Sequence, residues 1–184
     1  MATLHGSLSP DLQAFIAAQK LFFVATAPNE GRLNVSPKGL DSLCVLDERT
    51  VAYLDHTGSG NETAAHLRQN GRMTLMFCSF DAKPLILRLY GRGRVVLPGA
   101  ADWEGLRLHF PAMPGERQIM VLEMESCSTA CGFGVPLFEF KANRTRLPEW
   151  AGKAGAEGLA DYRRRNNLVS LDGLATGLDE SECF

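Results

Sequence analysis

Residues 53–78 read YLDHTGSGNETAAHLRQNGRMTLMFC, and this stretch predicts a strand, a tight loop, a short helix and a second strand. Residues 50–55 are rich in β-branched and aromatic side chains, which favour a strand. The glycines and small polar residues that follow favour a turn. Ser59 and Glu62 match a capping box at the start of the helix, and Asn70-Gly71 matches a helix stop. Residues 72–79 then predict the second strand.

The start of this predicted helix is a candidate binding site for an anion. Unpaired backbone N–H groups behind a glycine-rich loop, together with about half a positive charge from the helix dipole, suit a phosphate. Asn61 and Thr63 would add side-chain donors. A well-capped linker helix would have the same sequence pattern, so these residues alone leave both interpretations open. His66 lies further along the helix, where we expect it at the surface.

On the N-terminal side, Ser9-Pro10 predicts the start of a helix with one apolar face. Residues 22–26 predict a buried strand, and a turn at 28–31 joins it in a hairpin to residues 33–35. Pro37 has no backbone N–H, so residues 36–39 are expected at a strand edge or bulge, where side chains are often redirected into a site. Lys38 is a candidate partner for an anion, and a solvated loop lysine is the alternative.

On the C-terminal side, residues 85–97, LILRLYGRGRVVL, form the longest strand candidate. Strand alternation gives two faces, one with Leu85, Leu87, Leu89 and Val95 and one with Ile86, Arg88, Tyr90, Arg92 and Arg94. The apolar face belongs in a core. The arginine face could bind an anion, contact a second subunit or lie in solvent. Gly91 and Gly93 suggest close backbone approach, as in a barrel wall.

The remaining chain predicts a helix at 100–110, a strand at 117–125, a loop at 126–136, a short strand at 137–141 and helices at 144–151 and 157–166. Hairpin turns and alternating strands favour an antiparallel sheet over a doubly wound parallel one. The fold class is therefore mainly β (α+β), a small antiparallel barrel with peripheral helices. We expect one domain at residues 1–142 and a helical and loop appendage at 143–184, packed on that domain.

Composition excludes several classes of protein. The net charge of the 184 residues is −2, which does not favour nucleic acid or a membrane surface as partner. No apolar run is long enough to span a bilayer, and the first residues do not resemble a signal peptide. The five cysteines, Cys44, Cys78, Cys127, Cys131 and Cys183, therefore predict reduced thiols in a cytoplasmic protein. Cys127 and Cys131 have no second close pair, so no metal site is expected.

Several of these segments together resemble the pyridoxamine 5′-phosphate oxidase-like flavoproteins. They are GRLNVSPKGLDS, YLDHTGSGNETAAHLRQN, MTLMFCSF and LRLYGRGRVV between residues 22 and 97, and CGFGVP at residues 131–136. The resemblance implies a six-stranded antiparallel split β-barrel that forms a homodimer, with FMN bound at the subunit interface. It also implies contacts to FMN at matching positions. These are Asn34, Val35, Ser36 and Lys38, then His56 and Thr57, then Asn61, Glu62 and Thr63. Apart from these matches, a more distant base such as Lys38, Arg88 or Arg92 is our candidate partner for the phosphate.

The sequence departs from the biosynthetic oxidase in two ways. That enzyme has Ser-Arg-Lys where this chain has Asn61-Glu62-Thr63, and its C-terminal substrate-binding pattern is missing here. Both differences count against vitamin B6 oxidation. The resemblance implies an FMN-dependent oxidoreductase that transfers hydride or electrons to an unknown small molecule, with unassigned catalytic residues. The alternatives are a non-catalytic flavin carrier or sensor, and a split-barrel protein that binds haem, with His56 near the site, or a deazaflavin.

Overall fold

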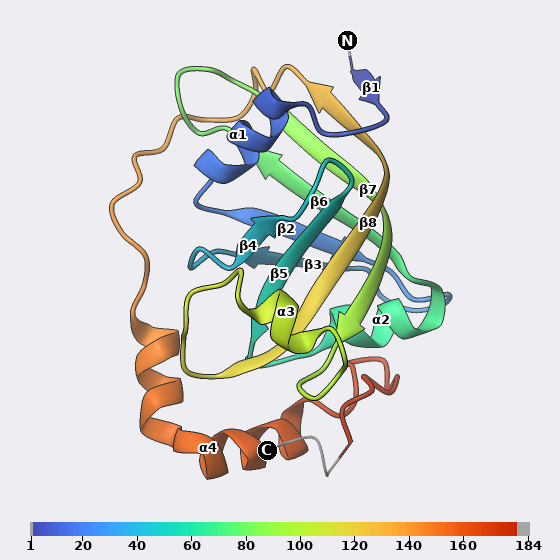
Figure 1. Cartoon of the computed structure of the whole chain (residues 1–184), viewed down its shortest axis with the longest axis vertical. Coiled ribbons are helices and arrows are strands. Elements are labelled where there is room, and N and C mark those ends of the chain that lie inside the picture. Colours follow the sequence, from blue (N-terminus) through green and yellow to red (C-terminus); the bar gives the residue numbers. More distant parts are fainter. Residues whose placement is uncertain (1, 180–184) are drawn as a thin grey trace.

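The computed structural model describes residues 2–179 as one curled antiparallel sheet with four helices around it (Figure 1). The strands are β1 (Thr3–His5), β2 (Phe22–Thr26), β3 (Asn34–Lys38), β4 (Leu43–Val45), β5 (Thr50–His56), β6 (Arg72–Cys78), β7 (Ile86–Val96) and β8 (Glu116–Ala130). The helices are α1 (Pro10–Ala18), α2 (Glu62–Asn70), α3 (Trp103–Arg107) and α4 (Arg146–Asn166). Cys183 lies outside the described residues.

The strands follow the order β3-β2-β6-β7-β8-β5-β4, and β1 pairs with β8. Although β3 and β5 are far apart in this order, Lys38 Nζ on β3 lies 2.6 Å from Asp55 Oδ1 on β5. The sheet must therefore curl until its two ends approach each other without backbone pairing, which is a split barrel. The predicted architecture is confirmed, but the predicted strand count of six is too low. β1 and β4 have three residues each, too few to show a period.

Two apolar clusters account for the core. The larger one fills the barrel and includes Val24, Tyr53, Leu75, Leu89 and Leu122. The second lies on the other face of β5 and β8, where α3 covers it with Trp103 and nearby Phe110. Alternate residues of β5 and β8 thus enter different clusters, as strand geometry requires.

Gly91 lies where β7 and β8 come close together. A Cβ atom at this position would lie 2.0 Å from the carbonyl oxygen of Glu123. The register between the two strands also shifts at Tyr90 and Gly91. The glycine therefore permits a backbone contact that any side chain would prevent, as the sequence predicted.

The predicted stop of helix α2 at Asn70-Gly71 is confirmed, but the predicted capping box at its start is not. Gly71 follows the helix with φ 67°, the left-handed conformation typical of a helix stop. At the other end the cap residue is Asn61, not Ser59, and no side chain caps the helix. The carboxylate of Glu62 accepts instead from the backbone N–H of Leu171 at 2.9 Å. The predicted capping box was therefore wrong, because a distant segment engages Glu62.

His66 was wrongly expected at the surface. Helix α2 packs this side chain against β2, where it is buried and its Nδ1 lies 3.0 Å from Thr26 Oγ1.

The predicted ends of helices and strands were least accurate after residue 100. Strand β8 continues to Ala130, because β7 pairs with it as far as that residue, so the loop predicted from residue 126 is partly strand. Residues 137–141 form no strand; they belong to an irregular segment that runs along the barrel towards α4 (Figure 1). The two predicted C-terminal helices are two halves of α4, which breaks at Gly155. The predicted helix at 100–110 is reduced to the single turn of α3.

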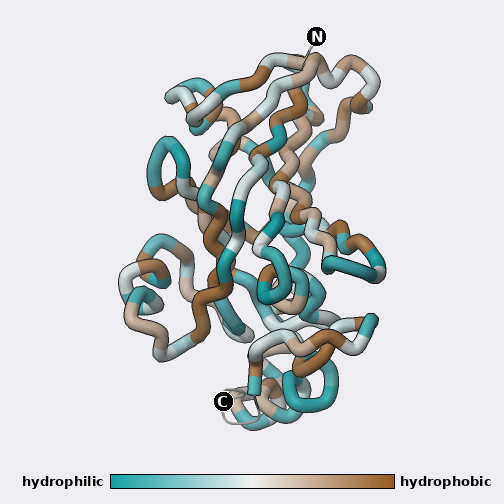
Figure 2. The backbone as a smooth tube through the Cα atoms, turned by 90° about the vertical axis from the view of Figure 1, so that its right-hand side faces the viewer, coloured by the Kyte–Doolittle hydropathy of each residue, from teal (hydrophilic) through white to brown (hydrophobic). Residues whose placement is uncertain are grey.

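The C-terminal segment, residues 163–176, lies at the end of the barrel where α2 begins. This end is opposite α1 and the N-terminus (Figures 1 and 2). Among the helices of residues 2–179, none has the length and apolar character that crossing a membrane requires.

Candidate functional site

A polar cleft of about 330 Å³ opens at this same end of the barrel. It lies between β3, the end of β5, the loop at 57–61 and the first turn of α2. The residues that line it are Asn34, Ser36, Pro37, Lys38, Asp55, His56, Gly58, Ser59, Gly60, Asn61, Glu62, Thr63 and Arg117.

Asp55 is the centre of the hydrogen bonds around this cleft. Its side chain is 2 % exposed and accepts from three other side chains. Lys38 Nζ donates to Oδ1 at 2.6 Å, while Arg117 Nη2 and Gln118 Nε2 donate to Oδ2 at 2.7 and 2.8 Å. The buried carboxylate thus holds two cations beside the cleft. Asp55, Lys38 and Arg117 together carry a net charge of +1.

A β-bulge explains how Arg117 reaches Asp55. Asp55 pairs with Gln118 across the strands, but the next residue, His56, pairs with Glu116, so Arg117 has no partner in the register. A bulge of this kind redirects a side chain that would otherwise face the opposite side of the sheet. Arg117 and Gln118 can therefore both donate to Asp55 although they are consecutive in the strand.

Burial and charge set the protonation of this cluster. Burial by itself would raise the pKa of Asp55, but the charges of Arg117 and Lys38 and the hydrogen bonds from Lys38 and Gln118 outweigh it. The pKa of Asp55 therefore lies well below its usual value, and the side chain is a carboxylate at neutral pH. Burial lowers the pKa of His56, against the opposing effect of Asp55, so this ring is neutral at pH 7.

The loop before α2 is held by side-chain donors. Arg117 Nη1 donates to the carbonyl oxygen of Gly60 at 3.0 Å, and Gln118 Nε2 donates to Asn61 Oδ1 at 2.6 Å. Asn61 Nδ2 in turn donates to the carbonyl oxygen of Asn167 at 3.4 Å. Its amide is thus engaged on both sides, so the side chain is less available to a ligand than the sequence suggested. Thr63 Oγ1 accepts from Asn34 Nδ2 at 3.4 Å and can still donate its own proton.

Of the ten candidate residues for binding the cofactor, nine from the resemblance and Arg88, the structure brings seven to the cleft: Asn34, Ser36, Lys38, His56, Asn61, Glu62 and Thr63. Val35, Thr57 and Arg88 do not line it. Thr57 is buried, and its hydroxyl accepts from Arg163 Nε at 2.9 Å.

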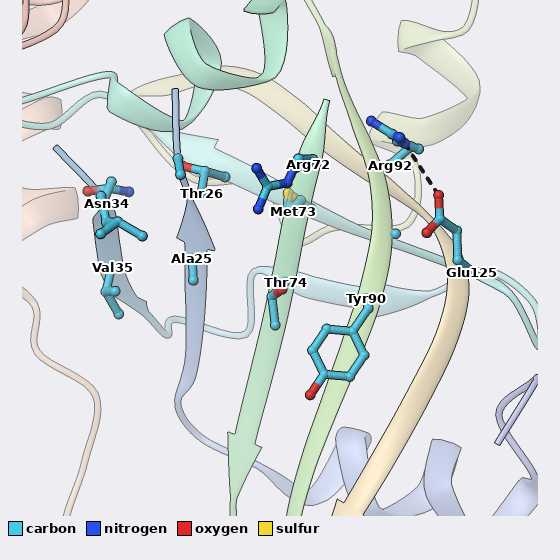
Figure 3. A pocket seen from close by; sticks show the side chains of 13 residues that line it. Ala25, Thr26, Asn34, Val35, Arg72, Met73, Thr74, Tyr90, Arg92 and Glu125 are labelled. Atoms are coloured by element: carbon cyan, nitrogen blue, oxygen red, sulfur yellow. Dashed lines mark hydrogen bonds and ion pairs between the residues drawn. The ribbon is translucent and has the colours of Figure 1, made fainter. Parts of the chain in front are cut away.

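Strand alternation explains why Val35 and Arg88 lie outside the cleft. Across the sheet, Val35 lies in register with Ala25, Thr74 and Tyr90, and together they line a separate hollow on the outer face (Figure 3). Arg88 has the same parity as Tyr90, so it belongs to this outer face, whereas Lys38 and Asn34 face the barrel interior. Arg88 is also three strands from β3, or about 14 Å.

Sequence reasoning missed Asp55, Arg117 and Gln118. Asp55 ends an apolar run, YLD, and a buried acid at such a place requires a partner. That signal was available in the sequence. Nothing in the sequence paired Asp55 with residues more than sixty positions away, because the pairing depends on the bulge.

No cluster of His, Cys, Asp and Glu side chains within residues 2–179 is arranged to hold a metal ion. The cysteines in this range, Cys44, Cys78, Cys127 and Cys131, are all free.

Fold and cleft together define a split-barrel protein with a cation-containing polar cleft at one end of the barrel. Comparison with known sequences places the chain in the pyridoxamine 5′-phosphate oxidase family. The family profile for "Pyridoxamine 5'-phosphate oxidase" matches residues 8–131, and all residues that line the cleft lie within that range.

The chain is similar to the "Pyridoxamine 5'-phosphate oxidase family protein ustO" of Aspergillus flavus, with 42% identity over 192 residues. That alignment covers 95% of this chain and 77% of the relative.

Two solved structures show the same fold. A variant of HupZ from Group A Streptococcus has 20% identity and a TM-score of 0.53, over 67% of this chain and 99% of that one. An FAD-binding protein from Mesorhizobium loti has 16% identity and a TM-score of 0.50, over 71% of this chain and 99% of that one.

Proposed function

We propose that this protein binds FMN in the cleft between β3 and α2 and acts as an oxidoreductase on a small molecule. The observation that carries the proposal is the pair of cations, Lys38 and Arg117, held by one buried carboxylate beside the uncapped start of α2. Membership of the pyridoxamine 5′-phosphate oxidase family supports a flavin. So does the Mesorhizobium loti neighbour, which is an FAD-binding protein.

Buried polar atoms around the cleft fit a polar ligand. His56 Nε2, Gln118 Oε1 and Asn167 Oδ1 are buried without a hydrogen-bond partner among residues 2–179. Orphaned polar atoms of this kind are rare in proteins and usually meet water or a ligand. His56 lines the cleft, so its ring is a candidate for a contact with the flavin, whereas its Nε2 is buried in the unliganded chain.

The phosphate of FMN would bind at the first turn of α2. Here the chain lacks the arginine and lysine of the biosynthetic oxidase, and Arg117 supplies a cation from β8 instead. The negative charge of Glu62 is partly offset by the N–H that Leu171 donates to it. Backbone N–H groups and the helix dipole would contribute the rest of the attraction.

Bound FMN supplies reversible hydride or electron transfer at its ring system. The residues of this chain would bind and orient that ring and adjust its charge. Lys38 is the candidate cation for stabilising a reduced anionic flavin, because its ammonium group is fixed at the edge of the cleft by Asp55. His56 is neutral at pH 7, so it can donate one hydrogen bond and accept another.

We also propose a homodimer in the cytoplasm. On and beside the edge strand β3, Leu33 and Val35 are 80% and 64% exposed, and an exposed apolar surface of this kind favours contact with another subunit. Light scattering on the purified protein should give twice the mass of the chain, and a monomer would contradict this part of the proposal.

The absorption spectrum and the mass of the released cofactor test the main proposal. FMN should give a yellow protein, and heat denaturation should release one FMN per chain. An intense Soret band would indicate haem instead, and a released deazaflavin would replace FMN in the proposal. Bound FMN that NADH and NADPH reduce no faster than free flavin would favour a carrier or sensor.

A further inference from the structure

The C-terminal segment, residues 163–176, contacts the loop that precedes α2. This segment lies outside the range of the family match, which ends at residue 131, whereas the loop lies inside it. Residues from the appendage therefore complete the surroundings of a site that belongs to the family domain.

Arg163 and Asn167 make the buried contacts. Arg163 Nε donates to Thr57 Oγ1 at 2.9 Å, and its Nη2 donates to the carbonyl oxygen of Glu116 at 2.7 Å. Asn167 is fully buried, and its Nδ2 donates to the carbonyl oxygen of Gly58 at 3.0 Å. The backbone carbonyl of Asn167 accepts from Asn61 Nδ2.

Several contacts of the segment engage acceptors of the loop or of the first residue of α2, and one contact, to Asn167, takes up a loop donor, Asn61 Nδ2. The oxygen atoms of Thr57, Gly58 and Glu62 receive donors from the C-terminal segment. Those of Gly60 and Asn61 receive donors from Arg117 and Gln118. Exposed acceptors would repel an anion, and a donor on each one reduces that repulsion. The loop and the start of α2 therefore present fewer free acceptors to an anion.

The segment is in turn held by a hydrogen bond within itself and by contacts with Arg32, between β2 and β3. Thr176 Oγ1 donates to the carbonyl oxygen of Asn167 at 2.7 Å, and Asp172 accepts from the backbone N–H of Arg32 at 2.7 Å and forms an ion pair with its side chain. The position of Asn167 therefore depends on contacts outside the loop as well as within it.

We propose that the C-terminal segment, through Asn167 and Arg163, positions the loop at 57–61 to receive the terminal phosphate of the flavin. The inference rests on the proposed function, since it concerns the same site. Asn167 and Arg163 are positioning residues that act through the loop. Removing one of them should weaken binding of the phosphate while leaving binding of the flavin ring nearly unchanged.

The test compares FMN with riboflavin, which has the same ring and no phosphate. In Asn167→Ala, we expect FMN affinity to fall about tenfold or more, because Gly58 loses a buried donor, and riboflavin affinity to stay within about twofold. Thr176→Val is nearly isosteric and should give a smaller loss in the same, phosphate-specific direction. Fluorescence titration measures both affinities. Arg164→Ala, which removes an exposed pair with Asp161 on the same helix, is the matched control and should change neither.

Equal losses for the two ligands, or no loss in either variant, would overturn the inference while leaving flavin binding intact. If wild-type protein bound no flavin, the proposed function would fail, and hydrogen exchange of the unliganded protein would then decide about the segment. Faster exchange at residues 57–62 in Asn167→Ala than in Arg164→Ala would support the positioning role, and identical exchange would refute it.

Discussion

Two groups of cationic side chains on this barrel differ in what surrounds them. Lys38 and Arg117 converge on the buried carboxylate of Asp55. Arg92 and Arg94 on β7 each form an ion pair with an exposed carboxylate, Glu125 and Asp102. The pair distances overlap, so distance does not distinguish the groups. Burial does distinguish them. In the buried cluster, each charge needs its partner because water cannot reach it, whereas water can solvate either member of the exposed pairs.

The largest expected effect is on stability. Asp55→Ala would leave Arg117 buried at 3% exposure without its carboxylate, and we expect the free energy of unfolding to fall by about 3–5 kcal/mol. Urea denaturation at pH 7 measures it. Glu125→Ala removes the exposed counterpart and should change stability by less than about 1 kcal/mol. Similar losses in both variants would show that burial is not what separates the two groups.

The second expected effect is on ligand affinity. Lys38→Met keeps much of the side-chain volume and leaves Asp55 bonded to Arg117 and Gln118, so the protein should stay folded. We expect FMN to bind about tenfold to a hundredfold more weakly, since a charged hydrogen-bond donor is lost. Fluorescence titration gives the dissociation constant, with Arg94→Met as control. A wild-type affinity in Lys38→Met would remove this lysine from the proposed site.

The third expected effect is a pH dependence. Because the pKa of Asp55 is depressed in the folded protein, the unfolded chain binds the proton more readily. The stability that Asp55 contributes is therefore complete above its unfolded pKa of about 4 and is lost as the pH falls further, towards the folded value. Urea midpoints between pH 7 and 3 should decline less steeply in Asp55→Asn. Parallel curves for the two proteins would contradict the assignment.

The smallest expected effect concerns the outer face. Arg94→Ala breaks a half-exposed ion pair with Asp102 and should lower the free energy of unfolding by no more than about 0.2–1 kcal/mol. Thermal unfolding at low and high salt measures the difference, which should shrink in high salt because the pair is screened. A loss comparable to that of Asp55→Ala would mean that the outer arginines are integral to the fold.

The contrast also explains what the sequence could predict. The arginine face of β7 was readable because its members alternate along one strand, and long strands such as β5, β6 and β7 were placed almost correctly for the same reason. Seven of the ten candidate residues reach the cleft because they lie on β3, at the end of β5 and at the start of α2. The order of residues within short segments was sufficient to predict these strands and these cleft residues.

Contacts between distant segments were not readable. Arg117 joins Asp55 through a register shift in β8, and a shift of one residue leaves no periodic signal in the sequence. The capping-box prediction was wrong because Leu171, more than a hundred residues further on, engages Glu62. Val35 and Arg88 lie outside the cleft, because a position in the chain does not by itself give the face of the sheet on which a side chain lies.

Strand β3 forms one end of the strand order, and Pro37 lies within it, paired with Phe23 of β2. A proline offers no N–H to an incoming strand, so this rim is a poor template for unwanted extension of the sheet or for fibril growth. Two copies of the chain are thus more readily joined through their side-chain surfaces than by continuing one sheet into the next.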